Sequence, residues 1–253
     1  MVAESIHELY GRWQLDELLI QYPDLRIMPD DHRLVLRGPM PFRVVGPNGV
    51  YVEDSYNVEL AFSAGFPERI PMVLECDGRI PRSYHKLVGD YLCVAAPTEI
   101  RLKLRFAPTL LGYVQGFLIP YLYGYSCFEK HGIMPYGERG HDDSGIREYI
   151  AELFNSERIE HAEDFVRCTA MKKRRANKLP CPCDSGRRLG RCHNRTVNSM
   201  RARLGRKWFQ AEYARLLISL DRNPQVDAVE RWLDQTPLTL QIANVDNMEK
   251  SNV

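Results

Sequence analysis

The sequence has no apolar run close to the roughly 18 consecutive residues that a membrane-spanning helix needs. Its first residues, MVAESIHELY, also lack the basic start and the apolar stretch of a secretory signal. These absences predict a chain with no membrane association, and we expect a cytoplasmic protein. The hydrophobic content of 44% is typical of a globular chain and excludes one that is largely disordered.

Acidic residues are nearly absent from one long segment. Between Arg167 and Lys207 the chain has fourteen Lys and Arg residues and one acid, Asp184, which gives the segment a formal charge of +13. The whole chain carries only +1, so the remainder is acidic. We expect the segment either to bind nucleic acid through salt-sensitive phosphate contacts or to dock on an acidic partner, including the acidic remainder itself.

Internal repeats are absent, and so is a glycine-rich phosphate loop opening a helix. The chain therefore offers no nucleotide-binding domain with which to activate a carboxyl group. Cysteine occurs seven times, an odd number, and three of these residues lie with a histidine within thirteen positions. This pattern favours thiols used for metal binding or catalysis in a reducing compartment over a disulfide framework.

The front of the chain has the pattern of an antiparallel sheet. The clearest strand is 56–62, where apolar and polar residues alternate with the period of two that is typical of a half-buried strand. A strand over 33–45 precedes it, and the turn signal Pro47-Asn48-Gly49 joins the two. Residues 71–75 form a third strand. The sequence thus predicts a meander of three strands.

Helices are predicted on both sides of this meander. Apolar spacing indicates a first helix that ends near Tyr22, before a proline, with a change of phase near Gly11. An irregular segment over 78–106 is of the kind in which sites tend to lie. After it, residues 109–128 are predicted to form a helix that Pro120 kinks. Further helices are expected over 146–154 and 199–220.

The most specific signal in the chain is Cys181-Pro-Cys183 followed, after eight residues, by Cys192-His193. Thiolate and imidazole are ligands that zinc prefers, and two such pairs joined by a short loop can close a tetrahedron. Because all four ligand positions are filled, we expect a structural zinc with no open catalytic position. The alternative is a set of free thiols on a basic loop.

The segment PCPCDSGRRLGRCH resembles the SEC-C motif, a short zinc knuckle found at the end of the bacterial secretion ATPase and appended to many other proteins. That motif usually ends in Cys-Cys or Cys-His, and this copy ends in Cys192-His193. The resemblance implies a zinc knuckle over 179–195 that recruits a partner or holds the tail of the chain in place.

A second candidate site surrounds Cys93, which lies in the segment GDYLCV, eight positions after His85. A helix, a meander ending in the turn FPERIP, the segment SYH and then GDYLCV follow in an order that resembles the ubiquitin-conjugating fold. That family shows a Tyr-Pro-x-x-Pro turn, a His-Pro-Asn element and Gly-x-Ile-Cys-Leu. The resemblance covers roughly residues 1–155, and the His-Pro-Asn tripeptide is missing here.

The chain is most similar to bacterial members of that family that are encoded in CBASS antiphage operons and likewise lack the tripeptide. The resemblance implies an enzyme of antiviral defence. Such an enzyme joins the C-terminus of a cGAS-like nucleotidyltransferase, the acyl donor, to a lysine or similar amine on an acceptor protein. Some of these operons carry the conjugating protein without a separate activating enzyme.

Three residues take catalytic roles in this interpretation. Cys93 would carry the thioester, because a thiolate is both a strong nucleophile and a good leaving group. His85 would orient the loop, stabilise charge or act as a base, and the sequence does not choose among these. Asp90, the nearest acid, would help to deprotonate the amine. The alternative for Cys93 is a buried core cysteine.

We therefore predict an α+β protein with a ubiquitin-conjugating-like domain over 1–160, a basic linker over 161–178, the knuckle, and a helical tail over 196–253. Two other functions stay open at this point. One is a non-catalytic relative of the same fold that binds a protein, and the other is a nucleic-acid-binding protein that uses the basic knuckle.

Overall fold

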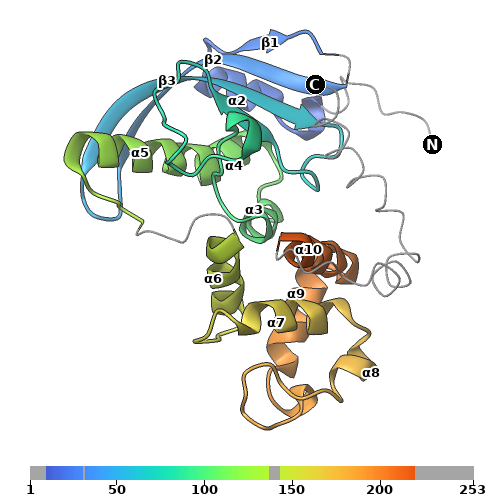
Figure 1. The fold of residues 1–253 in the computed structure, drawn as a ribbon. Coiled ribbons are helices and arrows are strands. Elements are labelled where there is room, and N and C mark those ends of the chain that lie inside the picture. The colour runs from blue at the N-terminus through green and yellow to red at the C-terminus, as the bar shows by residue number, and fades with distance from the viewer. Residues whose placement is uncertain (1–9, 31, 137–142, 220–253) are drawn as a thin grey trace, which may run out of the picture. The chain divides into compact units, whose positions relative to one another are not determined.

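The computed structural model describes residues 10–30, 32–136 and 143–219 (Figure 1). Contacts divide the chain into two compact units, residues 1–142 and residues 143–253. The first unit combines helices with a four-stranded antiparallel sheet, and the described part of the second is helical around a Cys/His cluster. No described helix combines the length and the apolar character that a membrane crossing requires.

The sheet of the first unit is a meander in which each strand pairs with the next along the chain. Its strands are β1 (Arg26–Met28), β2 (Arg33–Val45), β3 (Tyr51–Ser63) and β4 (Met72–Glu75). The three strands predicted from the sequence are present, and β3 begins earlier than expected. The short β1 was not predicted, because its three residues are all exposed and carry no alternation in hydropathy.

The turn between the two long strands follows the predicted signal. Gly46 and Val50 close the hairpin with a backbone hydrogen bond of 3.0 Å, and Gly49 adopts a positive φ of 76°. Pro39 and Pro41 lie in β2 beyond the part that β1 covers, so that β2 has a neighbour on one side only there. Proline is tolerated at such an edge because no ladder hydrogen bond is lost.

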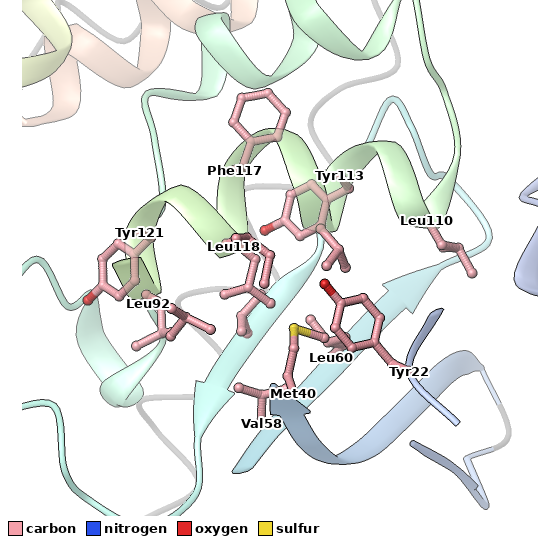
Figure 2. Close-up of a cluster of buried hydrophobic side chains, with 14 of the residues drawn as sticks. Tyr22, Met40, Val58, Leu60, Leu92, Leu110, Tyr113, Phe117, Leu118 and Tyr121 are labelled. Atoms are coloured by element: carbon pink, nitrogen blue, oxygen red, sulfur yellow. The ribbon is translucent and has the colours of Figure 1, made fainter. Parts of the chain in front are cut away.

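Helices pack around this sheet and close a core. They are α2 (Leu15–Gln21), α3 (Pro97–Leu104), α4 (Leu110–Tyr113), the π-helical turn η2 (Val114–Leu118) and α5 (Ile119–His131), with the short 3-10 turn η1 (Val88–Asp90) before α3. Figure 2 shows side chains of the helical stretch 110–121 meeting those of the strands, with Tyr113 above Leu60 and Tyr22. All three of these side chains are buried.

The predicted kink at Pro120 takes the form of the π-helical turn that precedes it. Thr109 caps the start of α4 by accepting a hydrogen bond from the Gly112 amide at 2.9 Å. Proline cannot donate to the preceding turn, and a wider turn relieves its clash with the backbone. The helical path therefore runs on through Pro120 and ends at Gly132, whose φ of 66° is left-handed.

A partly buried charge network joins β3 to α5. The two terminal guanidinium nitrogens of Arg79, Nη1 and Nη2, donate to the Asp54 carboxylate at 2.9 and 2.8 Å, and the Lys130 Nζ lies 2.8 Å from one of its oxygens. The buried hydroxyl of Ser126 donates to the same carboxylate at 2.8 Å. Burial alone would raise the pKa of Asp54, but these donors outweigh it and hold the pKa well below its usual range.

We expect Asp54→Asn to lower the free energy of unfolding by about 2 kcal/mol at pH 7, since hydrogen bonds to a charged group are lost. A carboxylate with a lowered pKa stabilises the fold fully above its ordinary pKa, about 4, and progressively less below it. The difference from wild type should therefore shrink between pH 4 and pH 2 in urea unfolding experiments. The exposed Asp24→Asn is the control, and an equal loss at both pH values would contradict the account.

The second unit contains five helices within its described residues. They are α6 (Asp143–Leu153), α7 (His161–Ala170), α8 (Lys173–Ala176), α9 (Asn194–Leu204) and α10 (Arg206–Ser219), and a 3-10 turn, η3 (Leu189–Arg191), precedes α9. Two sequence-based predictions for this unit differ from the helices observed. The segment 161–178, expected as a linker, holds two helices, because Ala162, Phe165, Val166 and Thr169 form a buried helical stripe.

The helix expected over 199–220 is the second difference. It starts earlier and breaks at Gly205, whose φ of 80° ends α9 before α10 begins. A residue in that conformation cannot continue a right-handed helix. Arg201 of α9 donates to the backbone carbonyls of Cys168, Thr169 and Met171, which satisfies the end of α7. Residues 220–253 of the predicted tail lie outside the described residues.

Candidate metal centre and cysteine loop

Within the knuckle predicted over 179–195, residues 179–193 form a short hairpin that presents its cysteines to one point. The Cys181 amide donates to the Arg187 carbonyl at 2.8 Å, and the Leu189 amide donates to the Leu179 carbonyl at 2.9 Å. Asp184 and Gly186 adopt positive φ angles of 56° and 70°, which fold the turn between the two arms. The hairpin thereby returns the chain so that the second ligand pair faces the first.

The four predicted ligands converge. The Sγ atoms of Cys181 and Cys183 lie 3.4 Å apart, and that of Cys192 lies 3.5 Å from Cys183. The Nδ1 atom of His193 is 3.2 Å from the Cys181 sulfur and 3.3 Å from the Cys192 sulfur. All four ligand atoms lie within 4.8 Å of one another. Zinc–sulfur and zinc–nitrogen bonds in a tetrahedron require edges of about 3.5 to 3.8 Å, so the donor set fits such an ion.

Backbone and hydroxyl donors surround the sulfur atoms. The amides of Cys183 and His193 donate to the Cys181 sulfur, although burial raises the pKa of that thiol to about 12. At Cys183, burial is outweighed by the hydroxyl and amide of Ser185 and by the neighbouring thiols, which lower its pKa to about 6. Donors aimed at sulfur are what a set of metal-bound thiolates needs, because they spread the negative charge.

Packing fixes the knuckle to the helices of its own unit. The imidazole of His193 meets the ring of Phe165 edge to face at 5.1 Å, and Phe165 stacks on Phe154 at 4.8 Å. Leu189 is fully buried beneath the hairpin. The Asp184 side chain accepts from His161 at 2.9 Å and from Arg158 at 3.2 Å, so this residue ties the turn to the loop before α7.

Cys93 ends a small hairpin at the edge of the sheet of the first unit. Lys86 and Leu92 form an antiparallel bridge, and the Cys93 amide donates to the His85 carbonyl at 2.8 Å. The Leu92 amide donates to the Val73 carbonyl of β4 at 2.8 Å, which fastens the hairpin to the sheet. In Figure 2 the Leu92 side chain lies beside Leu118 and Tyr121, where it is buried.

Two tyrosines from the central helical stretch lie within electrostatic reach of Cys93. Burial raises the pKa of both Tyr113 and Tyr121, and the charge that a Cys93 thiolate would carry adds to this, after that of Tyr84 in the case of Tyr121. The Tyr121 hydroxyl donates to the Tyr84 carbonyl at 2.9 Å and lies 3.2 Å from that of His85. The Tyr113 hydroxyl is buried and has no hydrogen-bond partner among the described residues.

His85 and Asp90 lie on the same hairpin as Cys93 with different surroundings. His85 adopts a positive φ of 40°, and its ring meets that of Tyr84 edge to face at 5.2 Å. Asp90 also has a positive φ, 64°, and both of its oxygens accept from Arg82 at 2.7 and 2.9 Å. This ion pair lowers the pKa of Asp90, which makes its carboxylate a weaker base.

The remaining cysteines differ from Cys93 in their surroundings. Cys127 and Cys168 are buried, whereas Cys76 and Cys93 are half-buried. Burial raises the pKa of Cys76, which follows β4 directly. Sequence patterns did not single out Tyr113 or Tyr121 as neighbours of the cysteine loop, because their proximity depends on how the central helix crosses the sheet. Arg82 was also missed, because its pairing with Asp90 depends on how the loop between β4 and Cys93 folds back.

Comparison with known proteins adds no identification, because no family model matches the chain and neither a curated protein nor a solved structure does. Function is therefore inferred from the chemistry of the two sites.

Proposed function

We propose that this chain is a cysteine acyl transferase of the ubiquitin-conjugating type, with Cys93 as the thioester-forming residue and a structural zinc knuckle in its second unit. The observation that carries the proposal is the placement of Cys93. It is a half-buried thiol at the end of a hairpin, hydrogen-bonded through its amide to His85 and fastened through Leu92 to the sheet. The order of a helix, an antiparallel meander, the cysteine loop and further helices supports the same fold family.

The chemistry requires two substitutions at one acyl carbon. In the first, the Cys93 thiolate attacks the activated C-terminal carboxyl of a donor protein, a C–S bond forms, and the activating group leaves. In the second, an amine attacks the thioester, a C–N bond forms, and the C–S bond breaks to return the thiolate. The amine proton passes to a base or to water. The donor must arrive activated, because the sequence shows no phosphate loop with which to activate it.

The charge that develops on the acyl oxygen needs stabilising donors. In place of the asparagine that eukaryotic members use, the imidazole of His85 would be the donor, because the Cys93 and Leu92 amides already donate to the carbonyls of His85 and Val73. Asp90, held by Arg82, is a weak base, and its ion pair instead stabilises the left-handed turn that precedes Cys93. We assign His85 to charge stabilisation or loop orientation and Asp90 to holding the loop.

The four knuckle ligands would hold the zinc ion in a closed shell, where its contribution is structural. Cys181, Cys183, Cys192 and His193 leave no protein ligand position open, and the aromatic pair Phe165 and Phe154 packs against the histidine. For the donor we propose a cGAS-like nucleotidyltransferase, and for the acceptor a lysine-bearing protein, from the resemblance to CBASS conjugating enzymes.

The proposal is tested by co-expressing the chain with a cGAS-like nucleotidyltransferase, the proposed donor. A covalent adduct that survives denaturation without reductant and disappears on adding dithiothreitol is the result expected of a thioester. A complex that forms without any covalent adduct under these conditions would contradict it, and would indicate a protein of the same fold that only binds its partner.

The unpartnered hydroxyl of Tyr113 gives a finer test of the site. We expect Tyr113→Phe to change the free energy of unfolding by less than about 1 kcal/mol, because no hydrogen bond within the described structure is lost. The rate at which iodoacetamide alkylates Cys93 at pH 7 should fall roughly threefold, because the thiolate loses a nearby O–H dipole. Tyr125→Phe, which removes a hydroxyl bonded to the Arg79 carbonyl, is the matched control and should leave this rate unchanged.

A further inference from the structure

The second unit carries a dense group of exposed cations around the metal centre. Eleven Lys and Arg side chains between residues 172 and 207 are exposed. They are Lys172, Lys173, Arg174, Arg175, Lys178, Arg187, Arg188, Arg191, Arg195, Arg203 and Lys207. The one acid in this span, Asp184, is already bound by His161 and Arg158. The charge that the sequence concentrates here is therefore presented to solvent.

The fold brings these cations together from separate stretches of chain. Pro180 and Arg188 form an antiparallel bridge, and the Gly190 amide donates to the Asn177 carbonyl at 3.1 Å. A Cβ atom at Gly190 would lie 2.9 Å from that carbonyl oxygen, so this close approach requires glycine. Helix α8 leads directly into the hairpin (Figure 1), which places the basic residues of 172–178 beside those of 187–191.

Within the described structure, no carboxylate pairs with the cations of α8 or of the stretch 187–191. Salt bridges of the second unit instead join Arg158, His161, Arg167 and Arg215 to carboxylates. Two basic residues of the same segment serve the fold instead: Arg167 pairs with Asp164, and Arg201 caps α7. The cations of α8 and of the stretch 187–191 are thus exposed to solvent and can meet an external anion.

The surroundings of the cations indicate which kind of anion. Protein interfaces are built around exposed apolar and aromatic anchors. No large apolar side chain between residues 160 and 207 is exposed in the described structure, and Phe165, the one Phe, Tyr or Trp in that span, is fully buried. A phosphodiester backbone needs no such anchor, because cations alone supply the binding free energy through release of counterions.

We propose that the knuckle unit binds nucleic acid through contacts of these Lys and Arg side chains to phosphates, without reading the base sequence. Without an exposed aromatic ring in the group, bases have no platform on which to stack. The binding is independent of Cys93 and of acyl transfer, and it would localise the enzyme to nucleic acid.

The test is fluorescence anisotropy of the full chain with labelled 30-base-pair DNA duplexes of two unrelated sequences, titrated between 50 and 200 mM salt. We expect equal affinity for both sequences and a linear fall of log K with log salt. Arg174→Gln, Arg175→Gln and Arg188→Gln combined should reduce the slope by about 2 to 3 and the affinity at 100 mM salt at least about tenfold.

The matched control combines Arg33→Gln, Arg43→Gln and Lys103→Gln, which removes the same formal charge from exposed cations that are paired with carboxylates in the first unit. This control should bind DNA as wild type does. An equal loss of affinity in both triple variants would contradict the proposal, because net charge rather than this surface would then be responsible. Binding of polyglutamate as tight as that of the duplex would also overturn it, in favour of an acidic protein partner.

Discussion

Cys93→Ala is expected to abolish conjugation of the donor protein, with a fall of at least about a thousandfold in the rate of product formation. In the proposed mechanism, both substitutions at the acyl carbon use the same sulfur atom, first as the nucleophile and then as the leaving group. Binding of the donor should persist, because Cys93 is half-buried at the end of a hairpin that is held by backbone hydrogen bonds. Conjugate yield and donor binding are measured side by side, by immunoblot and by pull-down.

Cys76→Ser is the matched control, since Cys76 is a half-buried thiol of the same unit. It should retain conjugation, which separates the loss of one particular thiol from any general effect of removing a cysteine. Full conjugation by Cys93→Ala would remove the basis for the acyl-transferase assignment. Loss of both conjugation and binding in Cys93→Ala would instead indicate a misfolded loop. Cys93→Ser keeps the size of the side chain, so it then separates misfolding of the loop from loss of the nucleophile: a variant that binds the donor but does not conjugate it has lost only the nucleophile.

Cys181→Ser is expected to have the second large effect, on metal content and on the stability of the second unit. Inductively coupled plasma mass spectrometry should find about one zinc ion per chain in wild-type protein purified without chelators, and none in the variant. Removing one ligand leaves three donors, and metal binding free energy is folding free energy in such sites. The unfolding temperature of the second unit should fall by roughly 10 °C or more.

Cys168→Ala serves as the control for that experiment. Cys168 is a fully buried cysteine of the same unit and lies outside the candidate ligand set, so its loss creates a small cavity without removing a ligand. Its zinc content should stay at that of wild type. Zinc bound stoichiometrically by Cys181→Ser, or no metal at all in wild type, would contradict the metal centre.

Local patterns predicted the sheet well, because strand signals repeat within a few residues. The alternation over 56–62 and the Pro-Asn-Gly turn fixed β3 and its hairpin with β2, and both are present. The break at Gly205 was missed, since glycine within an apolar periodic stretch is compatible with a continuous helix until the packing of both halves is known. Helix α7 was also missed, because the run of basic residues that follows it suggested a linker and its stripe of buried residues is short.

The two sites differed in how far the sequence could describe them. The four knuckle ligands lie within thirteen residues, so their spacing alone predicts that they meet. The surroundings of Cys93 come from distant parts of the chain: Val73 of β4 holds the neighbouring Leu92, and Tyr113 and Tyr121 approach from the central helical stretch. Such contacts depend on tertiary packing, and no local spacing encodes them.

The most direct test of the acyl-transferase proposal is intact-protein mass spectrometry of the Cys93→Ser chain after co-expression with a cGAS-like nucleotidyltransferase, the proposed donor. An oxygen ester is more stable to thiols than a thioester, so serine at this position should trap the acyl intermediate. We expect an adduct of the mass of the donor that resists dithiothreitol, is cleaved by alkali, and maps to residue 93. An adduct at any other residue, or no adduct while the two proteins still form a complex, would contradict the proposal.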